Sequence, residues 1–300
     1  MSQAQRVTKP DRGLRARMFV VMALLALVYI AFLRYLSSKG VGVGGLVVIA
    51  GLMLGVQYFF SAKLSMWGMG AKEVSRQEAP ELHAIVERLA SQAGIPKPKV
   101  AISKMAIPNA FATGRSPRHA VVAVTRGLLD RLEPREIEAV LGHEITHVTN
   151  RDVAVMTVAS FFAMLAFFAM RMFFFTGLFG GGSGRDNRNG ENSIWLVYLV
   201  SMAVYFVSQL LILALGRYRE LAADRGGAYI TNHPEHLASA LVKISEDMQA
   251  VPERARKPME AMNAFFIVPI TVKELFSTHP SLERRLEQLD QISHELGSAR

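Results

Sequence analysis

The chain contains no cysteine, and four long stretches of it contain almost no charged residues. The absence of cysteine excludes disulfide bonds and thiolate ligands, so any zinc ion must be held by histidine and carboxylate groups. Acidic residues are also scarce, with 25 Asp and Glu against 34 Lys and Arg and a net charge of +9. The basic residues are spread along apolar flanks and helices without an RNA-binding aromatic signature, so we expect attraction to an anionic lipid bilayer and no nucleic-acid partner.

The apolar stretches give the chain a hydrophobic share of 51% and a mean hydropathy of +0.23. Each approaches or exceeds the ~20 residues that a helix needs to cross ~30 Å of hydrocarbon, so we expect about four transmembrane helices. The stretches are residues 18–33, 41–60, 153–170 and 194–215. The third is the least regular because Arg171 follows it, although such a side chain can extend to a membrane interface.

The first stretch follows a basic tail and therefore has a second interpretation, a cleaved secretory signal. No A-x-A-like cleavage site follows it, and another apolar stretch begins almost at once. A retained membrane anchor is therefore the expectation.

Lysine and arginine predict the orientation of the spans, because they are enriched on cytoplasmic flanks. The tail carries Arg6, Lys9, Arg12, Arg15 and Arg17, which predicts a cytoplasmic N-terminus. Four crossings then divide the chain into residues 1–62 with the tail and two spans, 63–152 in the cytoplasm, 153–216 with two spans and a short external loop, and 217–300 in the cytoplasm.

The cytoplasmic segments indicate a mainly α protein with a small β-sheet, an α+β arrangement. Apolar residues at helical spacing predict helices over residues 80–93, 135–150, 218–230, 236–248 and 281–296. Short runs rich in β-branched or small apolar residues predict strands over residues 98–103, 109–113 and 120–125. Residues 251–271 form a Pro- and Met-containing loop without a clear pattern.

The sequence His143-Glu144-Ile145-Thr146-His147 combines a candidate metal site with a candidate base. Residues four apart lie on the same face of a helix, so His143 and His147 can present two imidazoles to one ion. Glu144 is close enough to reach a water molecule on that ion without binding the ion. This H-E-x-x-H arrangement is typical of zinc metalloproteases.

Two histidines do not complete such a site, since catalytic zinc usually has three protein ligands and an open position. Glu220 is the leading candidate for the third ligand, because it lies on the same predicted side of the membrane just after the fourth span. Asp224 lies four residues further on the same helical face, where it can accept a hydrogen bond from a ligand imidazole.

The chain resembles the HtpX type of membrane metallopeptidase, a gluzincin group related to the CAAX prenyl endopeptidases. Nearly the whole chain carries the resemblance. The matching features are the two N-terminal spans, Pro108-Asn109-Ala110-Phe111-Ala112-Thr113-Gly114, Gly142-His143-Glu144 through His147, Asn150, Asp152, Glu220 with Ala223-Asp224, and Ser277-Thr278-His279-Pro280 followed by Arg285.

The resemblance implies a zincin-like catalytic domain that binds one zinc ion per subunit through His143, His147 and Glu220, with Glu144 as catalytic base. It also implies an edge strand that pairs with extended peptide substrate and is formed by Asn109, Ala110, Phe111, Ala112 and Thr113. The implied activity is endopeptidase cleavage of misfolded or damaged membrane proteins, as quality control in the bacterial inner membrane.

A second donor should stabilise the oxyanion that develops during peptide hydrolysis. His279 and Arg285 are the candidates for this catalytic role, on the basis of their motif and their predicted cytoplasmic location. In the alternative interpretation, His279-Pro280 leads into the last helix and Arg285 pairs with a structural carboxylate.

The position of the motif predicts a metal site near the membrane. His147 lies six residues before Val153, and an unbroken helix would make that separation about 9 Å. Two other functions remain open, namely an intramembrane metalloprotease and a non-catalytic membrane scaffold or holdase that contains structural zinc. A structural site would need no base and would prefer a fourth protein ligand.

Overall fold

The computed structural model describes residues 12–179, 188–252, 266–268, 277 and 279–297. The chain forms two compact units. The first unit comprises Met1–Arg15, Phe59–Ala154 and Gly216–Arg300, and the second comprises Ala16–Tyr58 and Val155–Leu215.

The second unit is built from long apolar helices. The helices that contribute to it are α2 (Arg12–Ser38), α3 (Val43–Gly68), α7 (Asp152–Phe179) and α8 (Arg188–Thr231). All four are long and apolar enough to cross a membrane, which confirms the four predicted spans. Many of their large apolar side chains are exposed, such as Phe19 at 74% and Leu52 at 68%, as expected for contact with lipid. Inside the unit, the hydroxyl groups of Tyr29 and Ser208 form a buried hydrogen bond of 3.1 Å.

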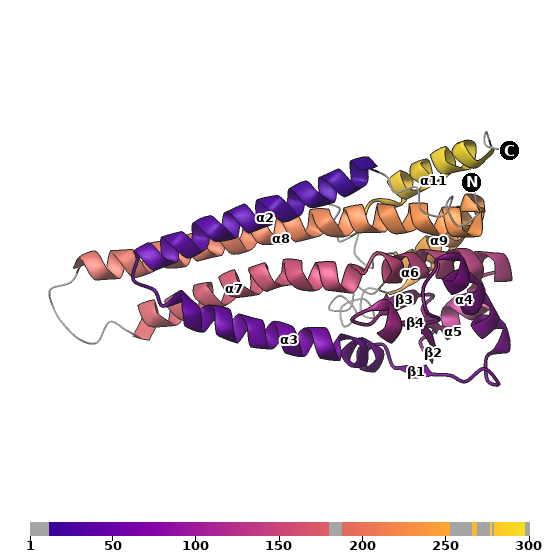
Figure 1. Cartoon of the computed structure of the whole chain (residues 1–300), viewed down its shortest axis with the longest axis horizontal. Helices are drawn as coiled ribbons and strands as arrows, with labels where there is room; N and C mark the ends of the chain where they lie inside the picture. Colours follow the sequence, from indigo (N-terminus) through magenta and orange to yellow (C-terminus); the bar gives the residue numbers. More distant parts are fainter. Residues whose placement is uncertain (1–11, 180–187, 253–265, 269–276, 278, 298–300) are drawn as a thin grey trace. The chain divides into compact units, whose positions relative to one another are not determined.

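Helix α8 is longer than the sequence predicted. The pattern indicated a span over residues 194–215 and a separate helix over 218–230, whereas the structure has one helix of 44 residues (Figure 1). The only conventional helix breaker at the predicted junction is Gly216, and a single interior glycine costs only about 1 kcal/mol relative to alanine. The structure therefore joins the fourth span and the candidate ligand Glu220 in one helix.

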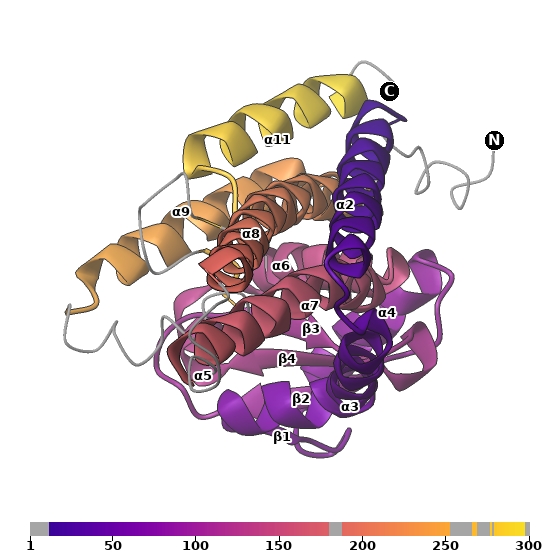
Figure 2. The ribbon, with the colours of Figure 1, turned by 90° about the vertical axis from the view of Figure 1, so that its left-hand side faces the viewer.

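The first unit contains a four-stranded sheet of order β1-β2-β4-β3. The strands are β1 (Ala71–Glu73), β2 (Lys99–Ser103), β3 (Ala110–Thr113) and β4 (Val121–Thr125). Strands β2 and β4 are parallel, and the other two pairs are antiparallel, with Ala112 opposite Val122. The three predicted strands are present, whereas β1 is too short to give a sequence pattern. Strand β3 thus lies at an edge of the sheet, next to α6 (Pro134–Thr149) (Figure 2).

The remaining helices are α4 (Pro80–Gln92), α5 (Arg126–Arg131), α9 (Pro234–Ala250) and α11 (Leu282–Gly297), with a 3-10 turn η1 (Pro117–His119). Of these helices, α4 and α9 pack against α6, whereas α11 packs against α9 and α5 against β4. Proline begins α6, and Glu133 and Glu136 form a capping box in which the Glu133 N–H donates to Glu136 Oε2 at 2.9 Å. Most of α6 is buried, which places the H-E-x-x-H segment within the core of this unit. The mainly α fold with a small sheet and four candidate spans is therefore confirmed.

The connection between α6 and α7 differs from the expectation of one continuous helix. Helix α6 ends at Thr149, Arg151 has a left-handed backbone with φ of 56°, and α7 begins at Asp152. A residue with positive φ cannot continue a right-handed helix. The separation of about 9 Å inferred from a continuous helix therefore does not apply.

Candidate metal centre and active site

The two histidines of the motif lie one turn apart on α6, and their Nε2 atoms are 3.0 Å apart. Helix α8 approaches this part of α6 through two glycines. A Cβ atom at Gly227 would lie 2.7 Å from the backbone nitrogen of His143. One at Gly226 would lie 2.3 Å from the Cγ2 atom of the Thr146 side chain. Side chains at either glycine would therefore force the two helices apart. These glycines position Glu220, and the sequence alone gave no reason to single them out.

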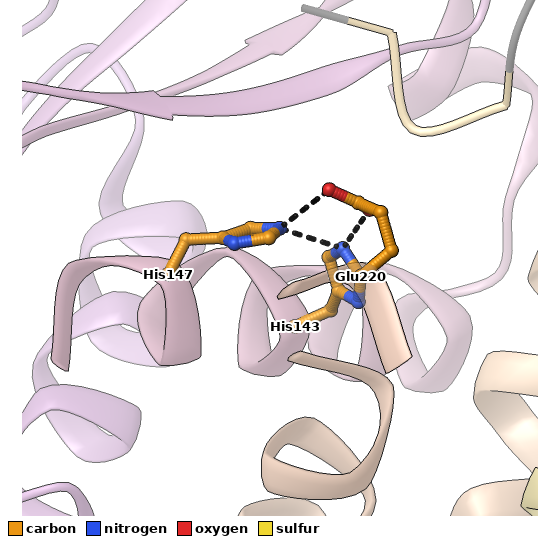
Figure 3. A group of neighbouring side chains, drawn as sticks. All are labelled: His143, His147 and Glu220. Carbon is orange, nitrogen blue, oxygen red and sulfur yellow. Dashed lines mark hydrogen bonds and ion pairs between the residues drawn. The ribbon is translucent and has the colours of Figure 1, made fainter. Parts of the chain in front are cut away.

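Glu220 reaches the two imidazoles from α8 (Figure 3). Its Oε2 atom lies 3.4 Å from His143 Nε2, and its Oε1 atom lies 3.6 Å from His147 Nε2. Ligands of a tetrahedral zinc ion with bonds of about 2.0–2.1 Å are about 3.3 Å apart. The donor set and its spacing therefore fit a single zinc-sized ion with few changes in side-chain position.

A carboxylate lies behind each imidazole. His143 Nδ1 is 2.9 Å from Asp224 Oδ1, and His147 Nδ1 is 2.5 Å from Asp152 Oδ2. Such partners keep the proton on Nδ1 and direct the Nε2 lone pair towards a metal ion. Asp224 was predicted for this position. Asp152 was noted only as part of the resemblance, because its location depends on the helix break that precedes it.

The electrostatics of the group favour a positive charge. Burial alone would lower the pKa of His143, but the carboxylates of Asp224 and Glu220 outweigh it and raise this pKa to about 9. The two carboxylates therefore favour a positive charge, whether a proton or a metal ion, at this imidazole. This is the behaviour of a site in which protons and metal ions compete for the same donor atoms.

Glu144 lies beside this group and is 3% exposed. Burial raises its pKa, and the neighbouring His147 and His143 and the Ala112 peptide N–H partly oppose that shift. A raised pKa makes a carboxylate a stronger base, which suits proton transfer near neutral pH. Glu144 therefore has the location and the chemistry expected of a general base.

A pocket lies over the donor group, and the edge strand forms one of its walls. Four of the five predicted substrate-binding residues line it, namely Ala110, Phe111, Ala112 and Thr113. The fifth, Asn109, is buried and does not line the pocket; its Oδ1 accepts a hydrogen bond of 3.0 Å from the Ile267 N–H. Phe266 and Ile267 also line the pocket, so the hydrogen bond from Ile267 to Asn109 fixes the backbone of one pocket-lining residue. Met259, Met262 and Phe265, in the Pro- and Met-containing loop, lie outside the described residues.

The structure separates the two candidates for oxyanion stabilisation. His279 lines the pocket, and its Nε2 lies 3.7 Å from Glu220 Oε2. Burial lowers the pKa of His279 to about 4, so its imidazole is neutral near pH 7. Arg285 is 1% exposed and is not among the pocket-lining residues.

The contacts of Arg285 support the structural alternative. Its Nε and Nη2 atoms donate to Asp224 at 2.8 and 2.6 Å, and its Nη1 donates to the Ile267 carbonyl at 2.6 Å. Asp224 thus links the guanidinium group to the candidate ligand His143. These contacts indicate that Arg285 positions His143 and the pocket wall, and they leave His279 as the candidate that faces the substrate.

Comparison with known proteins identifies the family. The sequence profile described as "Peptidase family M48" matches residues 76–293. "Protease HtpX homolog" of Moorella thermoacetica is 57% identical over 295 residues, covering 97% of this chain and 98% of that protein. "Protease HtpX homolog 2" of Methanosarcina acetivorans is 51% identical over 290 residues, with coverage of 95% and 97%.

A solved structure supports the fold. The crystal structure of S. mikatae Ste24p aligns with 92% of this chain and 67% of its own, with a TM-score of 0.57 and 17% sequence identity. At this identity the likeness concerns the fold alone. The sequence comparisons carry the assignment, and the site geometry agrees with a metal-dependent peptidase. The chain therefore belongs to peptidase family M48 and is an HtpX-type membrane metalloprotease.

Proposed function

We propose that this metalloprotease is a zinc endopeptidase that cleaves misfolded or damaged membrane proteins at the cytoplasmic face of a bacterial inner membrane. The observation that carries the proposal is the convergence of His143, His147 and Glu220 beside the buried base Glu144, under an edge strand. One zinc ion per chain, held by the first three residues, would act as a Lewis acid that polarises a carbonyl and lowers the pKa of water.

The residues around that ion have separate tasks. The Glu144 carboxylate accepts a proton from the attacking water and returns it to the leaving amine. The outer edge of β3 pairs with the extended substrate and holds it over the donor group. His279 donates a hydrogen bond to the developing oxyanion from the pocket wall.

Three observations favour this function over the alternatives. Helix α6 is not among the helices long and apolar enough to span a membrane, which disfavours an intramembrane protease. A structural zinc site in a scaffold protein would need neither a buried base nor a pocket lined by an edge strand. The described group also offers three protein ligands, as catalytic sites do.

Single cysteines test the proposed orientation, because the chain has none of its own. We expect a membrane-impermeant maleimide added to spheroplasts to label Ser37→Cys, in the last turn of α2, and not Gln77→Cys. Both residues are exposed, so accessibility will depend on the side of the membrane. Permeabilised membranes, in which both variants should react, provide the control. Labelling of Gln77→Cys alone in spheroplasts would reverse the orientation.

Proteoliposomes test the proposed substrates. The purified full chain with zinc should cleave a destabilised membrane protein at its cytoplasmic loops or tail, and it should cleave the stable parent of that protein at least about tenfold more slowly. The physical reason is that an edge strand binds extended chain, which a folded domain does not offer. A soluble unfolded protein bearing the same cleavage sequence is the control. Equal cleavage of all three proteins would contradict a preference for damaged membrane substrates.

A further inference from the structure

Arg151 has an unusual backbone conformation for its side chain. It follows the last residues of α6 with φ of 56°, and its N–H donates to the Val148 carbonyl at 3.1 Å. Glycine or asparagine usually occupies this position after a helix, because a Cβ disfavours left-handed backbone. Among the described residues, the other non-glycine with positive φ is Asn232, which has the usual residue type. A strained backbone conformation at a pocket is a reason to look for function.

The side chain of Arg151 is exposed and lines the pocket of the metal centre. The next residue, Asp152, contacts His147 Nδ1 at 2.5 Å, so Arg151 is covalently attached to the support of a candidate metal ligand. Its side chain therefore starts next to the place where a peptide must lie for cleavage.

Two of the three carboxylates that line this pocket contact histidine or arginine, and the third, Glu144, receives a hydrogen bond from the Ala112 N–H. Glu220 lies against the two histidines, and Asp152 contacts both His147 and Arg219, whose Nε is 3.1 Å away. No Asp or Glu in the part of the chain that the structure describes lies within 4.0 Å of the Arg151 guanidinium. The Arg151 guanidinium thus carries a positive charge that no carboxylate of the described residues pairs with directly.

We propose that Arg151 is a specificity residue that binds a carboxylate of the substrate peptide, next to the scissile bond on the His147 side of the metal centre. The carboxylate is an Asp or Glu side chain or the C-terminus of the peptide. Guanidinium groups bind carboxylates through two parallel charge-assisted hydrogen bonds, which gives both energy and orientation. This inference rests on the proposed peptidase function and adds a preference for acidic substrates to it.

Quenched fluorescent peptides test the preference on the full chain, loaded with zinc, in detergent micelles. One set carries Asp, Asn or Ala at each position around the scissile bond, and another compares a free C-terminus with its amide. We expect kcat/KM for the best acidic peptide to exceed that of its neutral partner about tenfold. The peptide position at which Asp raises kcat/KM, or a difference between the free C-terminus and its amide, will identify the source of the carboxylate. The ratio should fall as salt rises, because exposed charges are screened.

Two substitutions at the same position separate charge from backbone. In Arg151→Gly, which suits the left-handed conformation, the acidic-to-neutral ratio should fall to about 1, whereas Arg151→Lys should keep part of it. Asn232→Gly, at the other left-handed position, and Lys104→Gln, which removes an exposed charge away from the pocket, should keep the ratio of the wild type.

The outcomes are distinct. An unchanged ratio in Arg151→Gly overturns the inference while the peptidase function stands. Failure of the zinc-loaded wild type to cleave any peptide overturns the proposed function itself. An effect of Arg151→Gly that appears only in vesicles containing anionic lipid, and not in micelles, would assign the arginine to lipid contact and overturn the inference.

Discussion

Replacing Glu144 with glutamine is expected to lower kcat by about 10²–10⁴-fold and to leave the bound metal in place. The carboxylate lies beside the donor group without belonging to it, and burial raises its pKa towards the range in which a base works well. Glutamine keeps the size and a carbonyl oxygen but cannot accept the proton. Turnover of a quenched peptide and zinc content should be measured on the same preparation.

The same helix offers a matched control for this substitution. Glu138 also lies on α6, where it pairs with Arg88 at 2.8 Å away from the pocket. Glu138→Gln should therefore keep turnover within about twofold, because exposed ion pairs contribute little. A Glu144→Gln variant that cleaves as fast as Glu138→Gln would remove the base from the mechanism.

Replacing Glu220 with alanine is expected to reduce zinc affinity by more than 100-fold and to abolish cleavage at limiting zinc. Glu220 is the only carboxylate of the donor group, and its two oxygens face one imidazole each. Loss of an outer carboxylate typically costs 10–100-fold in affinity, and loss of a direct ligand should cost more. Competition with a chromogenic chelator measures this affinity in detergent solution.

Asp152→Asn provides the graded comparison, because this carboxylate contacts His147 and Arg219 without belonging to the donor group. Its zinc affinity should fall by 10–100-fold, between the wild type and Glu220→Ala. Asp224→Asn is a less suitable choice, since it would leave the buried Arg285 without its ion pair and destabilise the fold. Equal zinc affinities for the wild type and Glu220→Ala, with both proteins folded, would show that the third ligand lies elsewhere.

Local periodicity accounts for the parts of the site that the sequence predicted. The i, i+4 spacing places His143 and His147 on one helical face, and the same rule places Asp224 one turn after Glu220. The four spans follow from the length of the apolar stretches alone. Each of these features depends on residues within one helix, which is why the sequence alone was sufficient.

Features that depend on contacts between distant segments were not predictable in this way. Gly226 and Gly227 matter because α6 packs against them, and that contact joins parts of the chain far apart in sequence. The Ile267 N–H donates to Asn109 Oδ1, and the Ile267 carbonyl accepts from Arg285 Nη1. No sequence pattern connects these three residues. The sequence therefore left two roles open for Arg285, oxyanion stabilisation or pairing with a structural carboxylate, and its hydrogen bonds to Asp224 and to the Ile267 carbonyl favour the second.

The break between α6 and α7 has a similar cause. Neither Asn150 nor Arg151 is a glycine or a proline, the residue types that usually mark the end of a helix. Apolar residues resume almost immediately, at Val153. Only the backbone itself reveals the left-handed turn that sets Asp152 against His147. The same turn carries the positive charge from which we infer a preference for acidic peptides.

The most direct test of the central claim is the number of zinc ions bound per chain, measured by mass spectrometry on the same preparations that are assayed for cleavage. We expect one zinc ion in the wild type and in Glu144→Gln, almost none in Glu220→Ala at limiting metal, and cleavage by the wild type alone. Full cleavage by a protein stripped of zinc, or a wild-type zinc content in folded Glu220→Ala, would contradict this claim.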